Sequence, residues 1–253
     1  MKKLFALVLA GLFVLSGCSS GKDKGTIIVG TTGQSYPNSY EKDDKLVGYD
    51  IEVFEKAAKK AGYKVEWVKA DFSGVMGQLD SGRVDSVANA VAVTDERKEK
   101  YQFSNPYSYI GSQIVTSTKN KDINKYTDLK GKTVSGVMGS NHTEALEQFN
   151  KENNYGIKTK TYENRESAML DLDNRRIEGY INSSSVLSAE KNKKGKEIKF
   201  VGKPINVEAT SFPFKKDNAD KKEDINKGIK ELKDSGELKE LSEEYFGEDT
   251  TKK

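Results

Sequence analysis

One stretch of the chain, residues 75–89, is repeated at residues 168–182. The two copies share a methionine, a Leu-Asp pair, an arginine and a final asparagine at the same spacing. Each copy reads as the end of an amphipathic helix, a turn and a strand. A chain that uses one helix–strand unit twice is expected to form two similar lobes, with two strand ends facing each other across a cleft. Chance similarity is the alternative, and the run of matched positions disfavours it.

Helical and strand-like patterns alternate around each copy. Near the N-terminus, strand-like residues 26–30 and 65–68 flank a helical pattern at residues 50–61, which Asp50 can cap and Gly62 can end. This alternation predicts an α/β fold with mostly parallel sheets.

Two helical patterns close the chain, and we expect them to pack back on the first lobe. We therefore predict a discontinuous first lobe, residues 26–115 and 207–253, and a second lobe of residues 116–206.

Composition limits the partners of the chain. Its 253 residues are 35% hydrophobic and 32% charged, which is typical of a soluble globular protein. Lysine and arginine are scattered among acidic residues and are not gathered in one stretch. We therefore expect no nucleic-acid partner.

The N-terminus has the pattern of an export signal. Residues 1–17 combine Lys2 and Lys3 with an apolar run and end at Leu-Ser-Gly before Cys18. This junction resembles the lipobox of bacterial lipoproteins, which implies that Cys18 is lipidated and that residues 18–25 form a polar tether. An ordinary secretory signal is the alternative. We expect a lipid-anchored protein on the outer face of the cell membrane, or on its periplasmic side where an outer membrane is present.

Nucleophilic and metal chemistry are poorly supported. Cys18 is the only cysteine and His142 the only histidine, so the sequence offers no histidine–cysteine metal site. We expect no metal, no cofactor and no catalytic residue, and we expect His142 to cap a helix or lie at the rim of the cleft. Acid–base chemistry by carboxylates alone stays open.

Two features could bind an anion. Arg97 follows a helical turn opened by Thr94, where its guanidinium could bind a carboxylate, although it could also be an ordinary surface arginine. Residues 139–141, Gly-Ser-Asn, precede a helical pattern and could present free N–H groups, although serine and asparagine are also usual helix caps.

Several longer motifs occur in a characteristic order. They are GYDIE at 48–52, LDSGRVD at 79–85, TDER at 94–97, FSNPY at 103–107 and LKGKTV at 129–134. With the signal, they make the chain, from residue 26 to 246, resemble the solute-binding proteins of polar amino acid ABC importers, most of all the branch that binds cystine and related polar amino acids. The resemblance implies a periplasmic-binding-protein-like fold with two crossover strands, no catalysis, an ABC permease as partner, and a monomer.

The same resemblance assigns roles in the cleft. Arg97 would bind the α-carboxylate of an amino acid, with help from the turn Gly139-Ser140-Asn141. The main chain of Ala90 would accept from the α-ammonium, and that of Ala92 would donate to the carboxylate. Aromatic walls would come from Tyr36 and Phe72.

Two positions depart from the family pattern. Ala92 stands where a threonine or serine is common, and Ser183 stands where the family has the aspartate that balances the α-ammonium. Either a nearby carboxylate such as Asp71 compensates or the ligand is not an ordinary α-amino acid. The alternatives are a binder of another small carboxylate, an extracytoplasmic enzyme resembling cyclohexadienyl dehydratases, and a sensor that reports to a membrane receptor.

Overall fold

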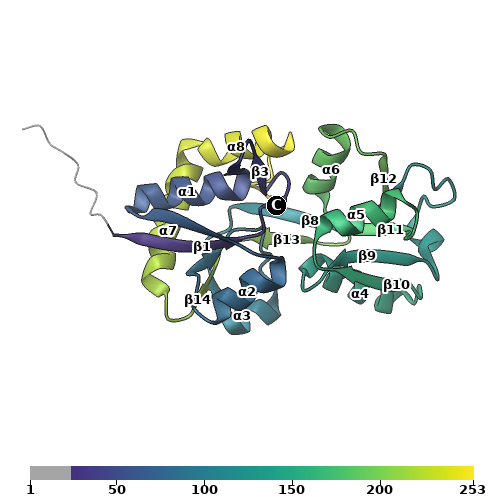
Figure 1. Cartoon of the computed structure of the whole chain (residues 1–253), viewed down its shortest axis with the longest axis horizontal. Coiled ribbons are helices and arrows are strands. Elements are labelled where there is room, and N and C mark those ends of the chain that lie inside the picture. The colour runs from purple at the N-terminus through teal and green to yellow at the C-terminus, as the bar shows by residue number, and fades with distance from the viewer. Residues whose placement is uncertain (1–23) are drawn as a thin grey trace, which may run out of the picture.

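The computed structural model describes residues 24–253, which form two α/β lobes side by side along the long axis of the molecule (Figure 1). The predicted signal peptide, Cys18 and most of the tether lie outside these residues. No helix within residues 24–253 is long and apolar enough to cross a membrane.

The first lobe is built on a five-stranded sheet of order β5-β1-β6-β14-β7. β1 pairs in parallel with β5 and β6, and β14 pairs antiparallel with β6 and β7. The strands are β1 (Thr26–Thr31), β5 (Lys64–Lys69), β6 (Ser86–Val87), β7 (Tyr101–Phe103) and β14 (Pro213–Lys215). The first copy of the repeat is predicted to end in a strand at residues 84–89, but only Ser86 and Val87 form a regular strand, and the chain turns at Ala90, whose φ is 50°.

Five helices cover this sheet. They are α1 (Tyr49–Ala61), α2 (Phe72–Asp80), α3 (Asp95–Lys100), α7 (Ala219–Ser235) and α8 (Glu237–Phe246). Apolar residues of α7 and α8 share one core cluster with Phe54 of α1 and Ile27 of β1, so the closing helices do return to the first lobe (Figure 1). Gly228 allows α7 to approach α1, because a Cβ there would lie 2.4 Å from the carbonyl oxygen of Ala57.

A small antiparallel sheet follows β1. It consists of β2 (Gln34–Ser35), β3 (Ser39–Lys42) and β4 (Lys45–Val47). The sequence predicts only a loop at residues 31–40, because the short polar strands have no apolar alternation that would reveal them.

The second lobe has its own sheet, of order β10-β9-β11-β8-β12. One half is parallel, since β9 pairs in parallel with both β10 and β11, and the other half is antiparallel, since β8 pairs antiparallel with β11 and β12. The new elements are η1 (Tyr126–Leu129), β9 (Thr133–Val137), α4 (Asn141–Asn153), β10 (Lys158–Tyr162), α5 (Arg165–Asp173), β11 (Gly179–Ser183), α6 (Ser184–Asn192) and β12 (Ile198–Val201). Two buried apolar clusters form its core, one containing Leu146 of α4 and the other Leu172 of α5.

Two antiparallel strands connect the lobes. β8 (Ser108–Ser117) pairs through residues 108–111 with β13 (Val207–Thr210), and through residues 112–117 with β11 and β12 of the second lobe. The two crossover strands expected from the sequence are therefore present. The division of the lobes at 115/116 and 206/207 stays a prediction.

The repeat is a structural repeat. Its copies are α2–β6 in the first lobe and α5–β11 in the second. Both helices begin in the same way: Asp71 caps α2 by accepting from the backbone N–H of Gly74, and Asn164 caps α5 by accepting from that of Ser167.

Candidate functional site

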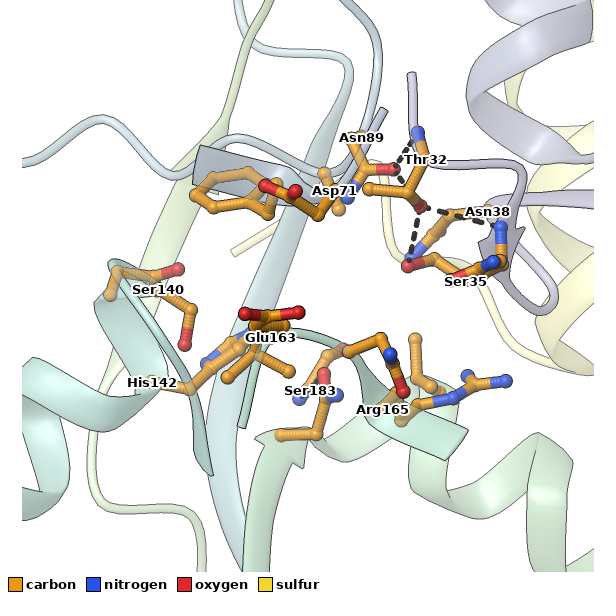
Figure 2. A pocket seen from close by; sticks show the side chains of 18 residues that line it. Thr32, Ser35, Asn38, Asp71, Asn89, Ser140, His142, Glu163, Arg165 and Ser183 are labelled. Carbon is orange, nitrogen blue, oxygen red and sulfur yellow. Dashed lines mark hydrogen bonds between the residues drawn. The ribbon is translucent and has the colours of Figure 1, made fainter. Parts of the chain in front are cut away.

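A polar cavity of about 720 Å³, including the part open to solvent, lies between the two lobes (Figure 2). Both lobes contribute to its walls. The first lobe supplies Thr32, Gln34, Ser35, Asn38, Asp71, Phe72, Asn89 and Ala90, and the second supplies Val137, Ser140, Asn141, His142, Glu163, Asn164, Arg165, Asn182, Ser183 and Val186.

The repeated units place equivalent positions on opposite walls. Asp71 and Asn164, the two helix caps, both line the cavity, and so do Asn89 and Asn182, which end the two strand segments. The repeat thus supplies the carboxyl end of one strand and the N-terminus of one helix from each lobe, which is where α/β folds bind ligands.

Asn89 organises the wall of the first lobe. Its Oδ1 accepts hydrogen bonds from the backbone N–H and the hydroxyl of Thr32, at 3.1 and 2.7 Å. The hydroxyl of Thr32 also lies 3.3 Å from that of Ser35 (Figure 2). These bonds join the ends of two strands and present a polar surface to the cavity.

A hydrogen bond to Asp50 holds the backbone at Ala90. The carboxylate of Asp50 accepts a hydrogen bond from the N–H of Ala90, and the side chain is only 1% exposed. Burial raises the pKa of Asp50 to about 7, while the hydrogen bond from Ala90 opposes that rise. The prediction that Asp50 caps α1 is wrong, because the cap position is Gly48. Asp50 lies in the first turn of the helix, and its side chain contacts Ala90 instead of the helix start.

Arg97 connects the two lobes beside the cavity. Thr94 caps α3 as expected, accepting from the backbone N–H of Arg97. The guanidinium is buried and donates to the carbonyl oxygens of Ala92, at 3.2 Å, and of Gly139 in the second lobe, at 2.9 Å. Its Cζ is 5.6 Å from the centre of the Phe72 ring. Burial lowers the pKa of Arg97, and the charges of Glu144 and Glu208 oppose that fall, although no carboxylate among residues 24–253 forms an ion pair with it.

The N-terminus of α4 is tied to both crossover strands. Ser140 is the helix cap and accepts from the backbone N–H of Thr143. Asn141 donates to Glu208 of β13 at 2.8 Å, and Nδ1 of His142 lies 2.8 Å from the hydroxyl of Ser112 in β8. These two hydrogen bonds fix the start of α4 relative to the strands that connect the lobes.

The sequence predicts that His142 either caps a helix or lies at the rim of the cleft. The cap of α4 is Ser140, and His142 lies buried in the wall of the cavity between the lobes. Burial, together with the positive charge of Arg97, lowers the pKa of His142 to about 3. The imidazole is therefore neutral at physiological pH, and with Nδ1 bonded to Ser112 its Nε2 is the atom left for another partner.

Ser183 lines the cavity at the position where the resemblance places an aspartate. Its side chain is 1% exposed, and its hydroxyl lies 2.9 Å from that of Ser185. Its backbone N–H donates to the side-chain oxygen of Asn182 at 2.7 Å. This part of the wall is neutral and already internally hydrogen-bonded.

Arg165 makes a second contact between the lobes. From the start of α5 it donates to the carbonyl oxygen of Tyr36 at 2.7 Å and forms an ion pair with Glu190 at 3.1 Å. Arg165 and Glu190 are both buried. The ring of Tyr36 packs against Tyr40 and lies under the ammonium of Lys194, 3.9 Å from the ring centre.

Most of the residues predicted for the site are brought together. Phe72, Ala90, Ser140, Asn141 and Ser183 line the cavity, while Arg97 lies beside it in contact with Ala92 and Gly139. Tyr36 is set apart, since its ring contacts Tyr40 and Lys194 and its carbonyl contacts Arg165. The ligand-binding roles of all nine residues stay predictions.

Several residues that line the cavity were not predicted from the sequence as site residues, among them Asn38, Asn89, Glu163, Arg165 and Asn182. The repeat could have pointed to two of them, because it ends in Asn89 and Asn182. The others carry no local signal. No group of three or more potential metal ligands occurs in residues 24–253.

Two α/β lobes joined by two antiparallel strands, with a polar cavity between them, define a two-lobed solute-binding protein. The family model of the bacterial extracellular solute-binding proteins, family 3, matches residues 27–248, and the chain belongs to this family.

Individual relatives agree with this placement. The probable amino-acid-binding protein YxeM of Bacillus subtilis is 47% identical, over 99% of this chain and 97% of its own. The L-cystine-binding protein TcyA of the same organism is 35% identical, over 92% of this chain and 86% of its own. Among solved structures, an ancestral arginine-binding protein bound to arginine has a TM-score of 0.80 and 33% identity, covering 89% of this chain and 100% of its own.

Proposed function

We propose that this protein is the extracytoplasmic binding component of an ABC importer, which captures a polar amino acid between its lobes and delivers it to a membrane permease. The observation that carries the proposal is the polar cavity between the lobes, with Arg97 and the N-terminus of α4 at its edge. Names of relatives support the ligand class, since they include proteins for cystine and for arginine.

The carboxylate of the ligand would bind at the Arg97 end of the cavity. The Arg97 guanidinium is buried without a carboxylate partner, and its bonds to two carbonyl oxygens leave further N–H donors available. Ser140 and Asn141 begin α4 here, so the positive end of the helix dipole adds to the attraction for an anion. A desolvated carboxylate is costly unless it is paired, and this end of the cavity offers the pairing.

The same proposal includes a lipid anchor in the membrane. Cys18 would carry a lipid that tethers a monomer to the outer face of the cell membrane, with the polar residues 18–25 as a spacer. We also propose that the protein binds its ligand without catalysing a reaction, because the chain belongs to a family of solute-binding proteins.

The test is a thermal-shift screen of the full chain in mild detergent against L-cystine, L-arginine, L-histidine, L-glutamine and glutarate. A ligand that binds only the native state raises the melting temperature by mass action. We expect a shift with at least one amino acid. A shift with glutarate and with no amino acid would contradict the proposed ligand class, and conversion of prephenate or arogenate by the same preparation would contradict a purely binding role.

A further inference from the structure

The cavity has no anion on the wall where an ammonium would be expected. Ser183 is neutral and hydrogen-bonded to Ser185. Arg165, the only cationic side chain lining the cavity, is paired with Glu190. Of the residues that line the cavity, only Asp71 and Glu163 carry carboxylates that could balance a positive charge on a ligand.

These two carboxylates come from opposite lobes. Asp71 is the cap of α2, and Glu163 immediately precedes Asn164, the equivalent cap of α5. Both also line an adjoining, more open hollow, which places them where the cavity opens to solvent. Figure 2 shows Asp71 on the upper wall and Glu163 on the lower wall. A cation between them would contact both lobes.

An independent feature shows that this cavity is built to receive a polar group. Asn38 lines the cavity and is only 6% exposed, and its backbone N–H donates to the carbonyl oxygen of Ser35, yet no residue among 24–253 hydrogen-bonds to its side-chain amide. The amide group is therefore open to the cavity, where a polar group of a ligand could hydrogen-bond to it.

We propose that Asp71 and Glu163 together bind the ammonium group of the ligand, one carboxylate from each lobe, in place of an anion at position 183. The inference rests on the proposed function and specifies it further. The ligand then lies with its carboxylate toward Arg97 and its cation toward the cavity mouth. Solutes that carry only carboxylates are excluded, because two negative charges would repel them at the mouth.

The repeat suggests a substitution of Asp71 that removes its charge and keeps the helix cap. Asp71→Asn keeps a side chain able to cap α2, since Asn164 caps α5 at the equivalent position, so the charge is removed with the cap retained. Glu163→Gln removes the second charge. Glu41→Gln is the matched control, because Glu41 lines the adjoining, more open hollow but not the cavity between the lobes.

The experiment is calorimetric titration of the full chain in detergent with L-cystine, L-arginine, L-histidine, L-glutamine and glutarate. For every amino acid that binds the wild type, we expect the double variant Asp71→Asn/Glu163→Gln to bind at least roughly tenfold more weakly. The affinity of each single variant should lie between those of the wild type and the double variant. The control Glu41→Gln should bind with the affinity of the wild type. Unchanged melting temperatures without ligand would confirm that folding is preserved.

The outcomes separate the two proposals. Amino-acid affinity within about twofold of wild type in the double variant overturns the ammonium site and leaves the proposed function standing. Binding of glutarate by the wild type as tight as that of any amino acid also overturns the ammonium site. A wild type that binds none of the amino acids overturns both.

Discussion

Arg97 of the first lobe donates a hydrogen bond across the cleft to the carbonyl oxygen of Gly139 in the second lobe, 2.9 Å away. Arg165 of the second lobe makes the reciprocal contact, 2.7 Å from the carbonyl oxygen of Tyr36 in the first. One buried arginine from each lobe therefore spans the cleft on either side of the cavity. They differ in their ionic partners: Arg165 has Glu190, while Arg97 has no carboxylate partner within residues 24–253.

Arg97→Ala is expected to weaken ligand binding by about 2–5 kcal/mol, because it removes one member of a desolvated charge pair with the ligand. Calorimetric titration with the amino acid identified in the thermal-shift screen measures the effect. Lys98→Ala is the control, since Lys98 lies on the same helix with its side chain exposed. Unchanged affinity in Arg97→Ala would remove Arg97 from the binding site.

Arg165→Ala is expected to lower the free energy of unfolding by about 3 kcal/mol, since Glu190 is left buried without its main partner. Urea unfolding without ligand measures this loss. The double variant Arg165→Ala/Glu190→Gln should recover part of it, because it also removes the buried carboxylate that would otherwise keep only the exposed Lys194 as an ionic partner. Arg176→Ala, which removes an exposed arginine from an ion pair with Asp171, is expected to change stability by less than about 1 kcal/mol. Equal losses of unfolding free energy in Arg165→Ala and Arg176→Ala would contradict this prediction. They would mean that the buried ion pair contributes no more to stability than the exposed one.

Asp50 makes stability depend on pH. Its pKa is raised by burial from the ordinary 3.8 to about 7, so between these values the folded chain binds more protons than the unfolded chain. The contribution of Asp50 therefore destabilises the fold as pH rises from 4 to 7, by up to about 4 kcal/mol. Asp50→Asn keeps an acceptor for the N–H of Ala90 and should make the slope of stability against pH more positive. Urea unfolding at pH 4, 5.5 and 7 tests this, with the exposed Asp217→Asn as control; parallel curves for Asp50→Asn and wild type would refute it.

His142 should act in the opposite direction. Its pKa falls from 6.5 to about 3 on folding, so between these values the unfolded chain binds more protons and stability decreases as pH falls. His142→Gln should remove that loss. Because His142 is the only histidine, its ring proton resonance can be followed directly. We expect no titration between pH 8 and 5 in the folded protein, whereas a midpoint near 6.5 would mean that the imidazole is solvated.

Local patterns predicted much of the fold. The repeated helix–strand unit, the Thr94 cap before Arg97 and the end of α1 at Gly62 all depend on residues within a few positions of one another, and all three are confirmed. Asp50 shows where such reasoning fails. Aspartate is a residue type that often caps helices, but the carboxylate of Asp50 accepts a hydrogen bond from the N–H of Ala90, 40 residues away in sequence.

The sequence by itself determined that the chain has two related α/β lobes. Apolar periodicity and helix capping depend on neighbouring residues, and the same helix–strand pattern occurs in residues 75–89 and 168–182. Only the tertiary structure decided which polar residues share the cavity. Asn38, Asp71, Glu163 and Arg165 come from separate segments, and nothing near each of them in sequence signals the others. They meet because the crossover strands bring the helix ends of the two lobes face to face, so that charges far apart along the chain lie around one cavity.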